Sequence, residues 1–582
     1  MTGLASTLAT IWRLAAPYFR SEDRRAGRAL LAAVIVIELA LVAVDVLINQ
    51  WNNRFYNALQ DRNWDAFVRE LTIFCGLAAA FIVLAVYQLY LNQWLQIRWR
   101  QWMTKAYLDN WLGASNHYRM QLLGDAADNP DQRIAEDIRL FVEKTLGIGV
   151  GLLSAVVTLG SFVVILWLLS AAAPLHLFGM QVAVPGYLVW AALIYAVVGT
   201  ALTHLIGWPL AKLNFNQQRY EADFRFNLVR VRENSEQIAL LDGEPAEHGR
   251  LMSRFGRLAA NWMLIMGRTK KLTFFTAGYR QASVIFPFVV VSPAYFAGAV
   301  QLGGLMQTAS AFNSVQTALS FFVTAYRDLA EWRAVIERLA GFEQAVAAGR
   351  AAAVTPPVVA VVPAAGRDSI ALHDLAVSLP NGVPLVAAGD IVVAPRDRVL
   401  VTGPTGAGKS TLFRAMAGIW PFGRGRIEVP QGATVMMLPQ RPYFPVATLA
   451  EAVSYPAEPG TFSPERIAEA LHAVGLPALA ERLAEEAHWN RMLSLGEQQR
   501  LGIVRALLHA PDYLFLDEAT ASLDEPGEAA LYRLLHERLA NSTIVSIGHR
   551  STLRALHRRQ LVLVRDGGLH RVRETAPEPA AG

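Results

Sequence analysis

Cysteine is nearly absent from this sequence of 582 residues, and its one occurrence, Cys75, lies in an apolar run. A disulfide framework and a cysteine-based metal site are therefore both excluded. Charged residues are also scarce, at 17% of the chain, and the formal net charge is only +5. So small an excess does not indicate binding to nucleic acid, and we expect it to arise from positive charge on cytoplasmic loops.

The N-terminus lacks an early apolar segment, because Arg20, Arg24, Arg25 and Arg28 precede the first apolar run. A cleavable signal peptide would place that run sooner, so we expect none. Hydrophobic residues nevertheless make up 53% of the chain. This composition is too apolar for an ordinary soluble protein and too charged for one that lies wholly in a membrane. The length predicts several domains, and a membrane part joined to a soluble part fits both facts.

Six stretches are long and apolar enough to cross a bilayer, which takes about 20 residues of helix. Residues 97–144 and 209–271 are long and rich in Arg and Lys, whereas 171–185 has no charged side chain. The positive-inside rule therefore places the N-terminus, both long loops and everything after residue 327 in the cytoplasm. The predicted spans are 29–50, 71–94, 146–170, 186–208, 273–299 and 305–327.

Composition divides the whole chain into four segments. Residues 1–344 form the predicted transmembrane domain, and 345–368, rich in Ala, Pro and Val, are predicted to be a linker. From residue 369 to 573, short β-like runs alternate with helical stretches, which is typical of an α/β domain with a buried sheet. Residues 574–582 are predicted to be a disordered tail. The predicted strands are Arg398–Thr402, Thr434–Leu438, Tyr513–Leu516 and Thr543–Ile547.

A glycine-rich run follows the first of these strands. It reads Gly403-Pro404-Thr405-Gly406-Ala407-Gly408-Lys409-Ser410, with Thr411 next. In such a P-loop the glycines let backbone N–H groups surround phosphate, the lysine reaches the β- and γ-phosphate oxygens, and the serine hydroxyl ligates Mg²⁺. An unrelated P-loop protein is the alternative at this point.

Four further signals follow in order. Gln440 comes after the second strand and suits a contact with metal and water, and Leu493–Arg500, which reads Leu-Ser-Leu-Gly-Glu-Gln-Gln-Arg, opens a helix whose free N–H groups and Ser494 can bind a γ-phosphate. The third strand ends at Asp517, a candidate Mg²⁺ ligand, with Glu518 beside it as a candidate general base. His549 follows the fourth strand, where it can sense the γ-phosphate.

Together these motifs resemble the ABC ATPases over residues 369–570. The resemblance implies bound ATP and Mg²⁺, a Walker B strand Tyr513–Asp517, catalytic Glu518 and His549, and metal ligands Ser410, Gln440 and Asp517. It also implies that Ser494, Gly496, Glu497 and Asp524 contact nucleotide held by a second copy of the chain. Two features depart from the pattern: Leu495 and Glu497 replace the usual Gly and Gln, and residues 369–400 lack the usual adenine-stacking aromatic.

Motifs in the membrane half narrow the resemblance. They are Trp51–Gln60, Ile97–Trp102, Asn129–Ile134 and Glu221–Phe226. With Leu493–Arg500 they resemble the SbmA/BacA-related bacterial ABC transporters and, more distantly, the ABCD half-transporters. The implied fold is an all-α six-helix transmembrane domain of the exporter type plus an α/β P-loop ABC ATPase domain, as a homodimer in the bacterial inner membrane. The implied cargo is a hydrophilic compound, either an antimicrobial-type peptide or a cobalamin-like molecule, and the implied direction is import. A fatty acyl or lipid transporter of the same fold is the alternative.

Residues in the spans give few clues to cargo. Glu38 and Asp45 lie seven residues apart, hence on one face of the first span. Ionisable groups at membrane depth face a cavity or a partner, so this pair either lines a path for a cationic substrate or pairs internally with Arg280. Asp45 could also lie near the outer interface. The loop segments Glu221–Arg225 and Asn129–Asp137 are either coupling contacts to the ATPase domain or solvated charged faces.

The expected partners are a second copy of the chain, the transported substrate and membrane lipid, with no nucleic acid. An ABC-type regulated channel remains a further alternative, distinguished by passive ionic current. The six apolar spans exclude a soluble ABC protein of repair or translation.

Overall fold

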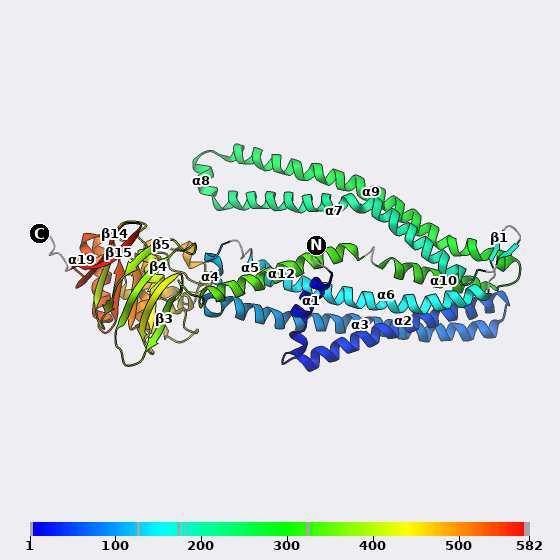
Figure 1. Cartoon of the computed structure of the whole chain (residues 1–582), viewed down its shortest axis with the longest axis horizontal. Helices are drawn as coiled ribbons and strands as arrows, with labels where there is room; N and C mark the ends of the chain where they lie inside the picture. Colours follow the sequence, from blue (N-terminus) through cyan, green and yellow to red (C-terminus); the bar gives the residue numbers. More distant parts are fainter. Residues whose placement is uncertain are drawn as a thin grey trace. The chain divides into compact units, whose positions relative to one another are not determined.

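A computed structural model describes residues 4–124, 129–172, 175–177, 180–182, 184–321 and 325–575. The chain divides into two compact units (Figure 1). Unit 1 comprises Met1–Ala106 and Asp131–Ala340, and unit 2 comprises Tyr107–Pro130 and Gly341–Gly582. Unit 1 is built from helices and unit 2 around a large β-sheet.

Long helices make up almost all of unit 1. Helix α7 runs beside α9, with the short α8 connecting them, and α10 lies against α2 and α6 (Figure 1). The bounds are α1 Leu4–Ala15, α2 Arg24–Gln60, α3 Trp64–Leu112, α5 Pro130–Gln132, α6 Ile138–Ala172, α7 Tyr187–Glu233, α8 Ser235–Leu240, α9 Glu244–Phe296, α10 Leu302–Leu319 and α12 Tyr326–Ala352, with a β1 Leu175–Leu177 and β2 Met180–Val182 hairpin.

Five of the six predicted spans lie in helices that are long and apolar enough to cross a membrane, namely α2, α3, α6, α7 and α9. The sixth prediction, 305–327, coincides in part with α10, and residues 322–324 lie outside the described residues. Helix α10 is shorter, at 18 residues, and is not among the five. Helix α10 is less hydropathic than the other five because it carries polar side chains such as Gln307. Gln307 forms hydrogen bonds with α2.

That bonding explains the Trp51–Gln60 motif. Asn53 Nδ2 donates to Gln307 Oε1 at 2.7 Å, and the buried Asn49 donates to the Gln307 carbonyl at 3.0 Å. Asn57 Oδ1 accepts from the backbone N–H of Gly303 at 2.8 Å, and so caps the start of α10. These amides are spaced by four residues and share one face of α2. Because apolar surroundings strongly penalise unpaired polar groups, the amide ladder fixes α2 to α10.

The Asn129–Ile134 motif leads into a π-helical turn, Arg133–Asp137. Asp137, only 1% exposed, accepts from Arg338 at 2.6 and 2.9 Å and also bonds to Arg133. A buried carboxylate needs such partners, since an unpaired charge in this position would cost several kcal/mol. The motif therefore joins the start of α6 to α12 within unit 1. The predicted docking of Asn129–Asp137 on the ATPase domain stays a prediction, as does that of Glu221–Arg225.

Unit 2 contains an 11-stranded sheet with the order β3-β8-β4-β5-β15-β14-β7-β13-β12-β9, and β6 paired to β4. The strands β14, β7, β13, β12 and β9 pair in parallel. Their bounds are β3 Val359–Ala364, β4 Ile370–Ser378, β5 Pro384–Ala388, β6 Ile391–Val393, β7 Arg398–Thr402, β8 Gly423–Pro430, β9 Val435–Leu438, β12 Tyr513–Asp517, β13 Thr543–Ile547, β14 Arg559–Asp566 and β15 Leu569–Thr575. The four predicted strands are confirmed to within a residue at each end.

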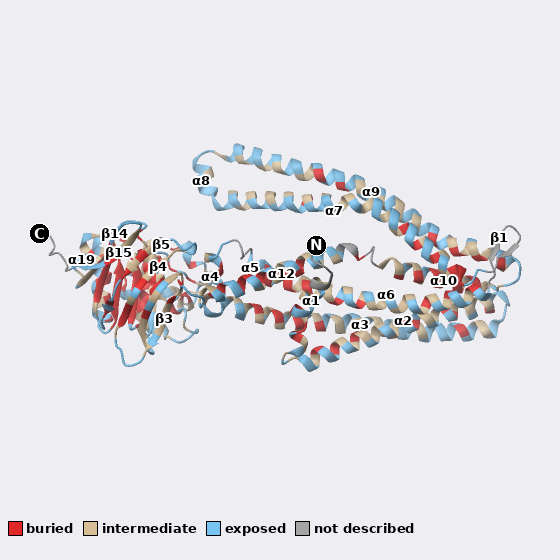
Figure 2. Cartoon of the chain, in the orientation of Figure 1, coloured by how far each residue is buried: buried red, intermediate tan, exposed pale blue. Residues whose placement is uncertain are grey.

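Two hydrophobic cores cover the two faces of this sheet, and Figure 2 shows the buried residues gathered in its strands. Successive side chains of a strand point to opposite faces. Accordingly, Phe515 of β12 and Val401 of β7 pack with α13 (Lys409–Met416), whereas Leu514 and Leu400 pack with α17 (Leu495–His509). Helices α13 and α17 therefore lie on opposite faces of the sheet.

The other helices of unit 2 are short. They are α4 Asn116–Leu122, α14 Leu449–Ser454, α15 Pro464–Ala473, α16 Trp489–Met492, α18 Glu525–Arg538 and α19 Ser551–Arg554, with a small β10 Ala447–Thr448 and β11 Glu486–Ala487 pair. Helix α4 comes from the long loop between the second and third predicted spans. Its Leu122 packs against the core that contains α13, and Asn116 donates to the Val346 carbonyl at 3.2 Å. The part of this loop from Tyr107 to Pro130 thus belongs to the same compact unit as the sheet.

The predicted linker and tail need correction in part. Residues 345–352 continue α12, and 359–364 form β3, which pairs in parallel with β8. Composition failed here because the Ala-rich stretch favours helix and the Val-rich stretch finds a strand partner about 65 residues later in the chain. Glu574 belongs to β15 and accepts from Arg559 at 2.8 Å, and residues 576–582 lie outside the described residues. The domain boundaries themselves stay predictions.

Candidate nucleotide site

The glycine-rich run Gly403–Gly408 connects β7 to α13 at the carboxyl end of the parallel strands. Gly408 has φ 89°, and a Cβ there would lie 2.6 Å from Val386 Cγ2. Only glycine fits, because the backbone conformation and the space both exclude a side chain. The resulting turn leaves the N–H groups at the start of α13 free, which suits an anionic phosphate.

Lys409 begins α13 and is 6% exposed. Its Nζ donates to the carbonyl oxygens of Gly403 and Pro404, at 2.9 and 3.0 Å. Burial lowers the pKa of this ammonium group, while the nearby Glu518 and Asp517 carboxylates act in the opposite direction. The lysine is therefore held within the loop and can exchange carbonyl partners for phosphate oxygens without a large movement.

Ser410 and Asp517 meet although they lie far apart in the sequence. The Ser410 hydroxyl donates to Asp517 Oδ1 at 2.8 Å. Asp517 ends β12 and is 9% exposed, and burial raises its pKa despite the bond from Ser410. A hydroxyl and a carboxylate beside a phosphate loop are the hard oxygen donors that suit Mg²⁺ bound to a nucleotide.

Glu518 and His549 form the second contact across the parallel strands. His549 Nε2 lies 3.3 Å from Glu518 Oε1. Glu518 has φ 51°, an unusual conformation for a residue with a side chain, and its N–H donates to the Ile547 carbonyl at 3.2 Å. Strained backbone is retained where the surroundings fix it, often at functional positions. The Glu518 carboxylate thus projects from the carboxyl end of β12 and lies next to His549.

Ser494 caps α17 from its N-terminus in a capping box. Glu497 Oε2 accepts from the Ser494 N–H at 2.9 Å and from its hydroxyl at 2.7 Å. Glu497, which stands where the ABC pattern has Gln, thus completes the capping box with Ser494, a role that either residue can fill. Gly496 faces Leu523, whose Cδ2 would lie 3.3 Å from a Cβ at the glycine.

The remaining predicted residues are placed separately. Gln440 is exposed, and its backbone carbonyl accepts a hydrogen bond from the side chain of Gln499 at 3.0 Å. Asp524 is exposed at the N-cap of α18, and Thr411 is half-buried in the first turn of α13. The structure therefore brings together Lys409, Ser410, Asp517, Glu518 and His549, and leaves Gln440 and Asp524 at the surface.

Two polar side chains around this site escape motif reasoning. Gln499, on α17, bonds to the loops after β9 and β12, and Arg550 bonds to the loop after β12. The sequence signal for these two residues is their position: Gln499 lies within the Leu493–Arg500 motif, and Arg550 directly follows His549. Apart from the contact of Arg550 with the Glu528 carboxylate, their bonding partners are backbone groups, which sequence motifs do not reveal.

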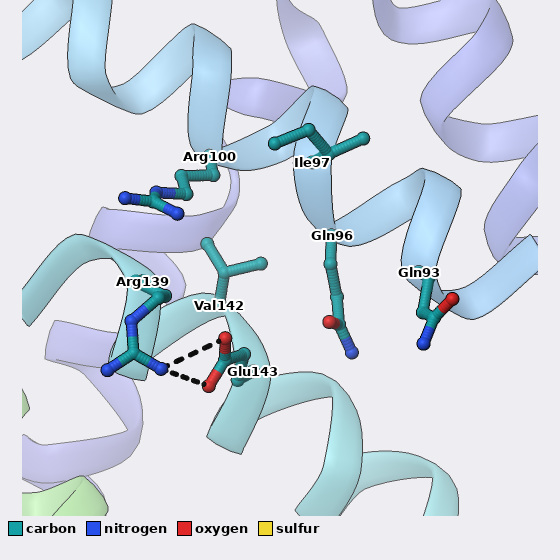
Figure 3. A pocket seen from close by; sticks show the side chains of 7 residues that line it. All are labelled: Gln93, Gln96, Ile97, Arg100, Arg139, Val142 and Glu143. Carbon is teal, nitrogen blue, oxygen red and sulfur yellow. Dashed lines mark hydrogen bonds and ion pairs between the residues drawn. The ribbon is translucent and has the colours of Figure 1, made fainter. Parts of the chain in front are cut away.

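Unit 1 has its own polar features. A pocket lies between α3 and α6 and contains the Arg139–Glu143 ion pair, whose two N–O distances are 3.0 and 3.3 Å (Figure 3). Nearer the first predicted span, Gln88 Nε2 donates to Glu38 Oε2 at 3.2 Å, and Asp45 is exposed. Among the described residues no ion pair joins Arg280 to Glu38 or Asp45. The pocket is lined by Gln93, Gln96, Ile97, Arg100, Arg139, Val142 and Glu143.

The sheet and these contacts define a P-loop nucleotide-binding domain, on a chain whose described residues include five helices of membrane-spanning length. Comparison with known families agrees with this class. Residues 14–296 match the family model of ABC transporter transmembrane region 2, and residues 390–521 match the family model named ABC transporter.

Known proteins resemble the chain along nearly its whole length. The Escherichia coli inner membrane ABC transporter ATP-binding protein YddA is 32% identical, over 92% of this chain and 93% of its own. The Arabidopsis thaliana ABC transporter D family member 2, chloroplastic, is 33% identical, over 96% and 86%. The human lysosomal cobalamin transporter ABCD4 is 26% identical, over 95% and 93%.

A solved structure of a bacterial Atm1-family ABC exporter with ATP bound has the same fold, with a TM-score of 0.70 at 18% identity, over 93% of this chain and 94% of that one. The chain belongs to the ABC transporter family, as a half-transporter of the ABCD type with one transmembrane and one ATPase domain. It binds ATP and couples ATP hydrolysis to transport across a membrane.

Replacing Glu518 with Gln tests the base suggested by this geometry. The amide keeps the size of the side chain but cannot accept the proton of an attacking water, and losing a general base typically costs ~10²–10⁴-fold in rate. We expect purified Glu518→Gln protein to bind ATP normally and to hydrolyse it at a rate reduced by this factor. Steady-state hydrolysis close to that of the wild-type protein would defeat the assignment.

Proposed function

We propose that two copies of this chain form a homodimeric importer that moves a hydrophilic substrate, an antimicrobial-type peptide or a cobalamin-like compound, across the bacterial inner membrane. The observation that best supports ATP-driven transport is the hydrogen bond from Ser410 to Asp517, which lies beside the contact between Glu518 and His549. Both contacts belong to a chain with five membrane-length helices. The peptide cargo and the import direction rest on the sequence motifs that resemble SbmA/BacA-related transporters alone, and the name of one relative supports a cobalamin-like cargo.

Each nucleotide-site residue has a proposed role. Lys409 exchanges the Gly403 and Pro404 carbonyls for β- and γ-phosphate oxygens, and the other residues of Gly403–Thr411 surround the phosphates with N–H groups. Ser410, Asp517 and Gln440 hold Mg²⁺, which when bound offsets the phosphate charge. Glu518 accepts the proton of the attacking water, and His549 orients that carboxylate and contacts the γ-phosphate.

The arrangement of α13 and α17 supports a dimer. These helices lie on opposite faces of one sheet, so the phosphate loop that leads into α13 and Ser494 at the start of α17 are separated within a chain. A second chain related by two-fold symmetry can offer its Ser494, Gly496, Glu497 and Asp524 to the first chain's phosphates, and receive the same in return. Two composite sites then form together, each needing both chains.

The contacts of α4 support coupling between nucleotide and cargo. Leu122 packs against the core that includes α13, and the loop that carries α4 connects two membrane spans. Displacement of α13 during nucleotide binding therefore reaches the loop through the hydrophobic core to which α13 contributes and against which Leu122 packs. We infer that this loop transmits closure of the ATPase domains to the membrane helices.

The human lysosomal cobalamin transporter, by its name, transports cobalamin, and YddA, by its name, lies in an inner membrane. Basic residues on the long loops favour the same orientation, with the ATPase domain in the cytoplasm. Glu38, bonded to Gln88 of α3, and the exposed Asp45 would present negative charge to a polar path. Among the described residues, no ion pair joins Arg280 to Glu38 or Asp45. This favours a role of the two carboxylates in the substrate path over an internal ion pair with Arg280.

Mixed dimers test the composite site. One chain carries Lys409→Ala and the other Ser494→Ala, with different affinity tags for purification. If Ser494 serves the partner's Lys409, one site is fully wild-type and the other holds both defects. ATP hydrolysis should then exceed that of either homodimer. Activity equal to the average of the two homodimers would contradict the proposal, because each site would then hold one defect from its own chain.

Uptake into oriented vesicles tests the cargo. Right-side-out and inverted membrane vesicles are offered a cationic peptide, cobalamin and an acyl-CoA, with Glu518→Gln protein as the control for ATP dependence. An importer accumulates peptide or cobalamin in right-side-out vesicles supplied with internal ATP.

The double substitution Glu38→Gln and Asp45→Asn should reduce peptide uptake more than cobalamin uptake and leave basal ATP hydrolysis intact. Transport of acyl-CoA alone would establish the acyl alternative, and unchanged peptide uptake would remove the two carboxylates from the path.

A further inference from the structure

Gln499 joins two loops of the nucleotide site through a single side chain. It lies on α17 and is 1% exposed. Its Nε2 donates to the carbonyl of Gln440, in the loop after β9, at 3.0 Å, and its Oε1 accepts from the N–H of Ser522, in the loop after β12, also at 3.0 Å. Only an amide of this length supplies a donor and an acceptor together, so no other residue type preserves both bonds.

Arg550 holds the same loop from the other side. Its guanidinium donates to the carbonyls of Leu523 at 2.7 Å and Ala521 at 3.1 Å. It follows His549 directly in the sequence, and one nitrogen also lies 3.5 Å from a carboxylate oxygen of the buried Glu528. The segment Ala521–Leu523, which we call the braced loop, is thus fixed through its N–H by Gln499 and through two carbonyls by Arg550.

The braced loop begins three residues after Glu518. Thr520, between them, donates its hydroxyl to Glu528 at 2.6 Å, so the loop has little freedom from the strand end onward. Glu518 already has an unusual φ of 51° and depends on its surroundings to keep that conformation. A shift of the braced loop therefore changes the direction in which the Glu518 carboxylate points.

We propose that Gln499 is a positioning residue for ATP hydrolysis. It transfers displacement of the Gln440 loop to the braced loop, while Arg550 transfers displacement at His549 to the same segment. Glu518 is aligned only when both loops are in place. This proposal rests on the proposed function, because it takes Glu518 to be the base.

The test compares Gln499→Leu with Thr543→Val, a matched control. Thr543 is also 1% exposed, and its hydroxyl also bonds to two backbone groups, the Arg396 N–H and the Ala394 carbonyl. It begins β13, at the opposite end of the strand from His549. Each substitution removes two buried bonds without a large change of volume, so both variants should lose thermal stability.

The measured quantities are the KM for ATP and the kcat per nucleotide-trapping site, which corrects for unfolded protein. Gln499→Leu should lower kcat about 10- to 100-fold, the range expected when a catalytic group is misplaced by about an ångström, with KM unchanged. Thr543→Val should leave both constants unchanged. Gln499→Glu, which retains the acceptor but not the donor, should give an intermediate kcat.

Equal kcat per site in Gln499→Leu and Thr543→Val would overturn the inference and reduce Gln499 to a structural role. An effect of Gln499→Leu on KM alone would do the same. The Glu518→Gln variant keeps this failure distinct from that of the proposed function. If Glu518→Gln abolishes hydrolysis while Gln499→Leu matches the control, the base assignment stands and only the positioning role is lost.

Discussion

The parallel pairing of β7, β13, β12 and β9 is the constraint on which the ATPase unit depends. Parallel strands place their carboxyl ends at one edge, so the phosphate loop after β7, Asp517 at the end of β12, Glu518 directly after it and His549 after β13 meet there. Their contacts at 2.8 and 3.3 Å follow from this register. A register slip of one residue would reverse the faces of each strand, exposing core side chains and moving α13 and α17 off their cores.

A different constraint shapes the membrane unit, where backbone groups are satisfied within helices and polar side chains must find partners. Asn49, Asn53 and Asn57 meet Gln307 and the start of α10, and Asp137 meets two arginines. These bonds are specific in position, so they fix which helices move together. Asp45 of α2, by contrast, is exposed.

Sequence patterns predicted the strands and the phosphate loop because these depend on local chemistry: an apolar run, a glycine-rich turn and the residues that follow. The same patterns failed at 345–364, where α12 and β3 depend on partners distant in sequence. Motif reasoning named Glu497 as a departure but could not foresee its capping role for Ser494. It missed Gln499 and Arg550, because their partners are backbone groups of loops that only the folded sheet brings together.

The central claim is that ATP closes a composite site between two chains, and a distance between the chains tests it most directly. A spin label is placed on Arg491→Cys, an exposed position beside the α17 cap, in a Cys75→Ser background that removes the natural cysteine. With Glu518→Gln to retain ATP, pulsed electron paramagnetic resonance in lipid nanodiscs reports the separation of the two labels. The account predicts a dipolar coupling whose distance shortens when ATP is added. No coupling, or one distance with and without ATP, would contradict it.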